Sequence, residues 1–149
     1  MNIWTFQRQL TTVLLGWGAA SISFGLSLMR GDNPFRRGMG EQFAGWGLVD
    51  SLIAFLGWAS ATRRQLLPDS GVPAIQAAER RKLARVLWVN TALDVFYVLG
   101  GLMTARKRGA TDEHWRGRGV GIMIQGGFLF FFDLINAVRA GRVDVPVVP

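Results

Sequence analysis

The sequence predicts an all-α integral membrane protein, built as an up-down bundle of four transmembrane helices. Hydrophobic residues make up 50% of the 149 residues and charged residues 18%, and the charges are concentrated between long apolar stretches. A helix needs about 20 mostly apolar residues to cross a hydrocarbon core that is about 30 Å thick. Four stretches have this length and carry at most one acid each: residues 9–29, 42–62, 86–105 and 119–138.

A soluble all-α protein is the alternative, because a fully buried helix can also be apolar all round. Helices of soluble proteins are usually shorter, and amphipathic helices accompany them. Four glycine-rich apolar stretches of one length therefore favour the membrane. The first stretch also has features of a signal peptide, but we expect it to be retained as a membrane helix.

The chain is predicted to form one domain, residues 1–149, with four helices and a tail. The expected helices cover about residues 9–29, 43–62, 73–104 and 120–138, and residues 139–149 are expected to be extended or disordered. The intervening segments are rich in glycine, proline and arginine, which is typical of loops at a membrane surface. These segments are RGDNPFRRGMGEQ, RRQLLPDSG and ARKRGATDEHWRGRG.

The third helix is predicted to extend beyond the bilayer at its N-terminal end. Pro73 suits the first turn of a helix, and AIQAAERRKLARVLW continues with helical character into the apolar span. Nine of the 17 lysines and arginines lie on the side of the termini and eight on the other side. This small excess favours cytoplasmic termini.

The composition excludes several kinds of site. There is no cysteine, so disulfides, thiolate catalysis, iron–sulfur clusters and cysteine metal sites are excluded. The single histidine, His114, lies in a charged segment, where a solvated side chain is more common than a ligand. The net charge is +7, but the basic residues flank the apolar spans, which favours anionic lipid headgroups over nucleic acid as partners. We therefore predict no catalytic residue, no metal site and no cofactor.

Polar residues inside the apolar spans are the strongest sequence signal of a functional site. An ionisable side chain in mid-membrane costs about 2.5–3.5 kcal/mol on insertion scales, so it needs a partner inside the bundle. In the third span Asn90, Asp94, Tyr97 and Gly101 recur at helical spacing and share one face. The predicted intramembrane polar cluster comprises Asp50, Asn90, Asp94, Tyr97, Gln125, Asp133 and Asn136.

We expect the polar faces of the third and fourth helices to meet. From their depths along the helices, Asn90 should contact Asp133, and Asp94 should contact Asp50 or Gln125. At least one of Asp50 and Asp94 should be protonated at neutral pH, because burial and a nearby like charge both disfavour the carboxylate. The cluster serves either as structural cross-links between helices or as a functional polar pocket.

Small residues indicate where membrane helices approach closely, since lipid gives helices no hydrophobic reason to associate. The first span carries one such stripe: Thr12, Gly16, Ala20, Ser23 and Ser27. Packing inside the bundle is the preferred interpretation of this stripe, and a dimer face is the alternative.

Three segments are distinctive together: WGLVDSLIAFLG, LWVNTALDVFYVLGGL and GVGIMIQGGFLFFFDL. They resemble a family of small bacterial four-helix membrane proteins known only as a domain of unknown function, over roughly residues 3–138. The family pattern more often has asparagine where this chain has Asp50, and GEQFAG replaces a histidine-containing approach to the second helix. The resemblance implies a bacterial inner-membrane protein and implies no reaction.

Three functions remain open. The preferred one is non-catalytic: an accessory or scaffolding subunit of a larger membrane assembly, or a homo-oligomer, with lipid and other membrane subunits as partners. The second is a small transporter or proton-conducting protein that uses intramembrane aspartates. A membrane enzyme is the weakest, since the sequence has no nucleophile, metal or redox motif.

Overall fold

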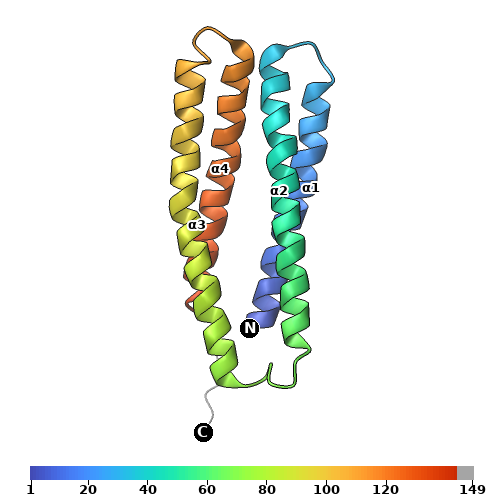
Figure 1. The fold of residues 1–149 in the computed structure, drawn as a ribbon, viewed down its shortest axis with the longest axis vertical. Helices are drawn as coiled ribbons and strands as arrows, with labels where there is room; N and C mark the ends of the chain where they lie inside the picture. The colour runs from blue at the N-terminus through green and yellow to red at the C-terminus, as the bar shows by residue number, and fades with distance from the viewer. Residues whose placement is uncertain (144–149) are drawn as a thin grey trace.

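The computed structural model describes residues 1–143, and these residues form four antiparallel helices (Figure 1). The helices are α1 Ile3–Met29, α2 Pro34–Gln65, α3 Pro73–Lys107 and α4 Glu113–Ala140. Each of them is long and apolar enough to cross a membrane. The predicted all-α four-helix bundle is therefore confirmed, and its helices are compatible with a membrane protein.

Three of the four helices begin earlier than the hydropathy pattern predicted, because capping residues lie outside the apolar spans, whereas α3 begins at Pro73 as predicted. Asn33 accepts a hydrogen bond from the backbone N–H of Arg36 (3.0 Å), and Pro34 occupies the first turn of α2. Asp112 accepts one from the backbone N–H of His114 (2.8 Å) and starts α4. The segment RGDNPFRRGMGEQ, predicted as a loop, is therefore mostly helix, and residues 30–33 alone connect α1 to α2.

The remaining bounds differ in the same direction. α1 begins at Ile3, not near residue 9, and α3 ends at Lys107, not near residue 104. The first two residues of the predicted tail belong to α4, residues 141–143 form a turn, and residues 144–149 lie outside the described residues. The hydropathy pattern marks only the apolar centre of each helix, whereas backbone hydrogen bonding continues into the charged ends.

α3 is the longest helix, as predicted, with 35 residues. At 1.5 Å per residue it is about 52 Å long, which exceeds the hydrocarbon core of about 30 Å. Figure 1 shows its N-terminal turns at the end of the bundle where α1 begins. α2 has 32 residues, so α3 is not alone in exceeding the core.

The bundle consists of two helical hairpins. α1 packs along α2, α3 packs along α4, and α2 and α4 join the hairpins to each other (Figure 1). Among the described residues, the backbones of α2 and α3 do not approach each other closely, and the two helices meet only through side chains such as Trp46 with Tyr97 and Arg64 with Glu79. A gap, which we call the seam, therefore separates the backbones of α2 and α3, and residues of α1 and α4 such as Leu14 and Phe132 line its inner side.

Glycines allow the packed helices to approach backbone to backbone. A Cβ atom on Gly47 of α2 would lie 2.6 Å from the carbonyl oxygen of Gly18 in α1. A Cβ atom on Gly101 of α3 would lie 2.8 Å from the carbonyl oxygen of Gly119 in α4. Glycine is therefore needed at these crossings, which confirms that small residues pack inside the bundle.

The stripe of small residues predicted to pack in the first helix does not do so. All five of its residues are exposed: Thr12, Gly16, Ala20, Ser23 and Ser27. A neighbouring stripe that includes Gly18, Ser21 and Gly25 contacts α2 instead. The two stripes are two residues or fewer apart along the helix and both are small, so composition alone could not choose between them.

At the end of the bundle with the short loops, an ion-pair network joins α2 to α4. Glu41 accepts a hydrogen bond from Arg118 Nε (2.8 Å), and its Oε2 lies 3.2 Å from His114 Nε2. His114 is half-buried in the first turn of α4. The expectation of a solvated loop histidine is therefore wrong, because α4 begins before His114 and brings it to Glu41.

The glycine crossings predict a matched pair of stability effects in α2. Gly47→Ala should lower the free energy of unfolding by about 1–3 kcal/mol, because the added Cβ meets backbone atoms that cannot move aside. Gly45→Ala is the control, because nothing lies within 4 Å of its added Cβ. Thermal melting in detergent measures both, and an equal melting temperature for the two variants would contradict the close approach.

Candidate functional site

Three carboxyl groups from three helices are buried next to each other inside the bundle. Asp50 of α2, Asp94 of α3 and Asp133 of α4 are 2%, 3% and 6% exposed. Asp94 and Asp133 lie within hydrogen-bonding reach of each other, and the Asn90 side chain reaches Asp133. Asp50 is close enough to interact with the charge of Asp94. The polar faces of α3 and α4 therefore meet as predicted, with Asp50 joining from α2.

Two carboxyl oxygens of this cluster lack a hydrogen-bond partner within residues 1–143. They are Oδ2 of Asp50 and Oδ2 of Asp94, and both atoms are buried. Most buried polar groups in proteins are hydrogen-bonded, and an unsatisfied one costs about 1–3 kcal/mol. Side chains that only held the helices together would be paired with each other. The unpaired oxygens favour a functional pocket over structural cross-links.

The carboxyl groups line a cavity of about 180 Å³, to which all four helices contribute. Asp50, Asp94 and Asp133 form its polar side, together with Asn90. Tyr97 lines it too, and its ring packs edge-to-face on Trp46, with ring centroids 4.9 Å apart. The rest of the lining is aliphatic or aromatic, so the acids face a largely apolar space.

A second cavity, of about 240 Å³, leads from the first toward the end of the bundle where α1 begins. Five residues line both cavities: Leu14, Ile53, Asn90, Phe132 and Asp133. Arg64, Glu79 and Lys82 line its far end, where Arg64 and Glu79 form an ion pair. Polar groups therefore extend from this charged end of the bundle to the buried carboxyls.

Both cavities lie along the seam between α2 and α3. The cavity lined by the three carboxyl groups, which we call the acid cavity, is bordered at the seam by three exposed side chains: Ile53 of α2, and Leu93 and Tyr97 of α3. The backbones of α2 and α3 remain apart along the seam because α2 packs closely on α1 and α4.

Gln125 is fully buried, but it faces α1 and not the acids. Trp17 Nε1–H donates to Gln125 Oε1 (2.9 Å), and Gln125 Nε2 donates to Ser21 Oγ (3.1 Å). Of the two neighbours expected for Asp94, Gln125 is therefore wrong, whereas Asp50 does lie near Asp94. Trp17 and Ser21 were missed because neither is ionisable, although a buried indole N–H usually has a hydrogen-bond partner.

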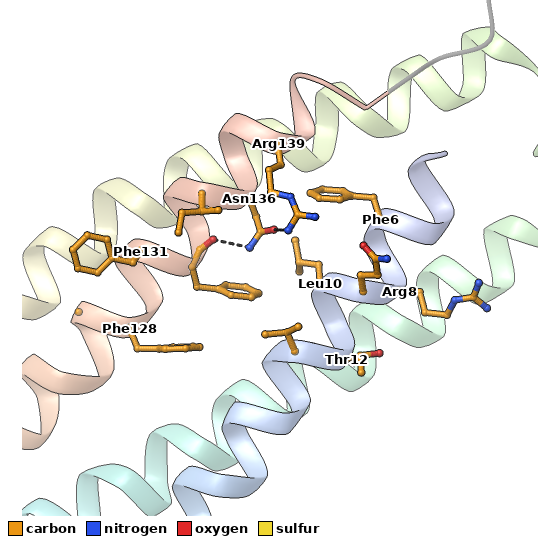
Figure 2. Close-up of a pocket in the computed structure, with 13 residues that line it drawn as sticks. Phe6, Arg8, Leu10, Thr12, Phe128, Phe131, Asn136 and Arg139 are labelled. Carbon is orange, nitrogen blue, oxygen red and sulfur yellow. Dashed lines mark hydrogen bonds between the residues drawn. The ribbon is translucent and has the colours of Figure 1, made fainter. Parts of the chain in front are cut away.

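Asn136 also lies outside the acid cluster. Its Nδ2 donates to the backbone oxygen of Phe132 in the same helix (2.7 Å), and Arg139 Nη1 lies 3.5 Å from its Oδ1. Figure 2 shows Asn136 beside Arg139 and Phe6, on the side of α4 that faces α1. Three residues along a helix turn a side chain by about 60°, which is enough to carry Asn136 away from the direction of Asp133.

The arrangement is suited to proton binding. A carboxyl group next to a carboxylate can share or transfer a proton, and Asp94 and Asp133 lie within that reach. No group of three or more histidine or acidic side chains in residues 1–143 is placed to hold a metal ion. The geometry therefore offers a chain of three proton-binding groups that begins at Asp133.

The chain was also compared with known proteins. The model of a family of unknown function, DUF6992, matches residues 13–134. Neither the curated proteins nor the solved structures gave a match. The matched region contains the three buried carboxyls and Asn90, and it ends before Asn136.

The hydrogen bond from Trp17 to Gln125 predicts a coupling between α1 and α4. Trp17→Phe, Gln125→Leu and the double variant should give an interaction free energy of about 0.6–1.7 kcal/mol, the range for hydrogen bonds between membrane helices. The phenylalanine keeps a ring against Phe128, on which Trp17 stacks at 3.7 Å. Strictly additive losses of unfolding free energy would show that the two side chains do not interact.

Proposed function

The chain belongs to DUF6992, a family of unknown function, and we propose that it is a small membrane protein that conducts protons, or couples them to transport. The observation that carries this proposal is the pair of unpaired oxygens on Asp50 and Asp94, at the inner end of a path of cavities. Ionisable residues buried between membrane helices typically mark ion pathways and proton relays.

In this proposal, protons enter from the end of the bundle that carries Arg64 and Glu79. Asp133 is the first carboxyl on the path, held by Asn90. Release of a proton from Asp50, on the other hairpin, leaves one carboxylate in the cluster. Asp94 then passes its proton to Asp50, and Asp133 passes its own proton to the Asp94 carboxylate, which lies within hydrogen-bonding reach. Asp133 is reprotonated from the charged end of the bundle, so the cluster carries one carboxylate at a time.

The path is closed beyond Trp46 and Tyr97, where α2 and α4 cross closely. A Cβ atom on Gly121 of α4 would lie 2.7 Å from the Gln42 side chain of α2. Only α2 and α4 join the two hairpins extensively, so a movement of one hairpin against the other would change this crossing and the Asp50–Asp94 separation together. In this proposal, a proton is released toward the short loops when one hairpin moves against the other.

A non-catalytic accessory subunit, or a homo-oligomer, is the second candidate. The open seam favours it, because the cavity side of α2 and α3 exposes Ile53, Leu93 and Tyr97. A neighbouring chain seated there would exclude lipid from the carboxyls. This role and proton conduction are compatible if the seam is closed by a second copy.

Proton conduction is tested with the purified protein in liposomes that contain a pH-sensitive dye. An imposed pH gradient should collapse faster with the wild type than with empty liposomes, and Asp94→Asn should reduce the rate by at least about tenfold. Asp32→Asn is the matched control, since Asp32 lies exposed in the loop between α1 and α2. The Asp94→Asn variant should fold, because asparagine keeps the shape of a neutral carboxyl. Equal rates for the wild type and a folded Asp94→Asn variant would overturn the proposal.

The accessory role is tested by native mass spectrometry of the protein released from its own membranes in mild detergent. A stoichiometric partner, or a dimer, supports closure of the seam by another chain. Ile53→Lys should disperse that complex, whereas Leu26→Lys, at an exposed position on α1 outside the groove and the cavities, should leave it intact. A monomer with no partner from native membranes would contradict an accessory role.

A further inference from the structure

We propose that the groove between α1 and α4 binds an anionic phospholipid, with its phosphate at Arg8 and Arg139 and one acyl chain along the phenylalanines of α4. The groove has a volume of about 710 Å³ and lies outside the acid cavity (Figure 2). This inference rests on the membrane location in the proposed function and not on proton movement.

The groove exists because the backbone of α1 packs closely on α2 and stays further from α4. Side chains of α1 and α4 meet at the two ends of the groove, at Phe6 with Ala137 and at Trp17 with Phe128, and leave space between these contacts. Phe128, Phe131 and Ile135 of α4 line one wall, and Leu10 and Val13 of α1 line the other. In Figure 2, Phe128 of α4 and Leu10 of α1 lie on the two sides of the groove. These walls are apolar, and the uncharged polar residues of the lining are Gln9, Thr12 and Asn136.

Two arginines line one end of the groove, and Figure 2 shows Arg139 at the groove while the Arg8 side chain extends away from it on α1. Arg8 and Arg139 are both exposed, and neither forms an ion pair within residues 1–143. Arg139 lies 5.6 Å from the centre of the Phe6 ring and 3.5 Å from Asn136 Oδ1, which holds it at the groove. No lining residue that the structure describes is acidic. The positive charge of this end is therefore available to an anion.

The length of the groove matches one leaflet of a bilayer. Arg139 and Phe128 are 11 residues apart on α4, or about 16 Å at 1.5 Å per residue. Half of a hydrocarbon core of about 30 Å is about 15 Å. With the arginines among the headgroups, Phe128 lies near mid-membrane. Basic pockets between membrane helices are typical sites for anionic headgroups.

Charge favours a lipid over a second copy of the chain. A symmetric dimer at this groove would bring two further arginines of the partner to the same end, with no acid to compensate them. A free phosphate would use the arginines but not the apolar walls. An anionic phospholipid uses both parts of the groove.

Native mass spectrometry of the full chain, purified in mild detergent, tests the inference. The protein is mixed with phosphatidylglycerol or with phosphatidylcholine of the same acyl chains. The wild type should retain phosphatidylglycerol preferentially, and Arg8→Gln with Arg139→Gln should reduce that preference by at least about tenfold. Arg63→Gln is the matched control, because Arg63 lies at the same end of the bundle on α2, outside the groove.

A second variant tests the acyl part without touching the arginines. Nothing lies within 4 Å of a Cβ atom on Gly127, which lines the groove, so Gly127→Leu should fold and obstruct the chain. It should reduce retention of both lipids. Equal losses in Arg63→Gln and the double arginine variant, or displacement by inorganic phosphate with no effect of Gly127→Leu, would overturn the inference. A wild-type dimer that Gly127→Leu abolishes without a change in lipid retention would assign the groove to a second copy.

The lipid site and the proton path can fail separately. Asp94→Asn should keep the preference for phosphatidylglycerol, and so loss of flux in that variant leaves the lipid site standing. If the protein stays monodisperse in buffer without detergent, the membrane location fails, and both proposals fail with it.

Discussion

The close backbone contact of α2 with two neighbours determines the rest of this bundle. Gly47 meets α1 at Gly18, while Gly38 of α2 meets the backbone of α4 near His114. A helix that is held this closely on two sides cannot also approach α3. Membrane helices lack a hydrophobic force that would draw them together, so these glycine crossings decide which pairs pack and which remain apart. The seam between α2 and α3 follows from them.

The acids are placed where this seam leaves space. Asp50 comes from one hairpin, and Asp94 and Asp133 come from the other, so the cluster spans the boundary between the two hairpins. A carboxyl in a tightly packed interface would be a fixed hydrogen-bonding group. A carboxyl group beside a cavity has room to reorient. In this cluster, one oxygen of Asp50 and one oxygen of Asp94 face the cavity without a hydrogen-bond partner among the described residues. The separation of α2 from α3 therefore creates the cavity that the three carboxyl groups line.

The sequence contained enough to predict the number of helices, their up-down order and the burial of the three aspartates, because burial of charge in an apolar span is costly wherever it occurs. The sequence was less informative about the face of each helix on which a polar or small side chain packs. The errors at Gln125, at Asn136 and in the α1 stripe are all rotations about a helix axis, since polar or small residues occupy more than one face. The early starts of α2 and α4 were visible in Asn33-Pro34 and in Asp112, but the nearby arginines and glycines concealed them.

Phe132 lines three separate spaces: the groove between α1 and α4, the cavity lined by the three carboxyl groups, and the second cavity that leads to the charged end of the bundle. The Phe132 side chain therefore lies between the apolar groove on one side and the buried carboxyl groups on the other. A rotation of the Phe132 side chain would therefore change the width of the groove between α1 and α4 and of both inner cavities at once.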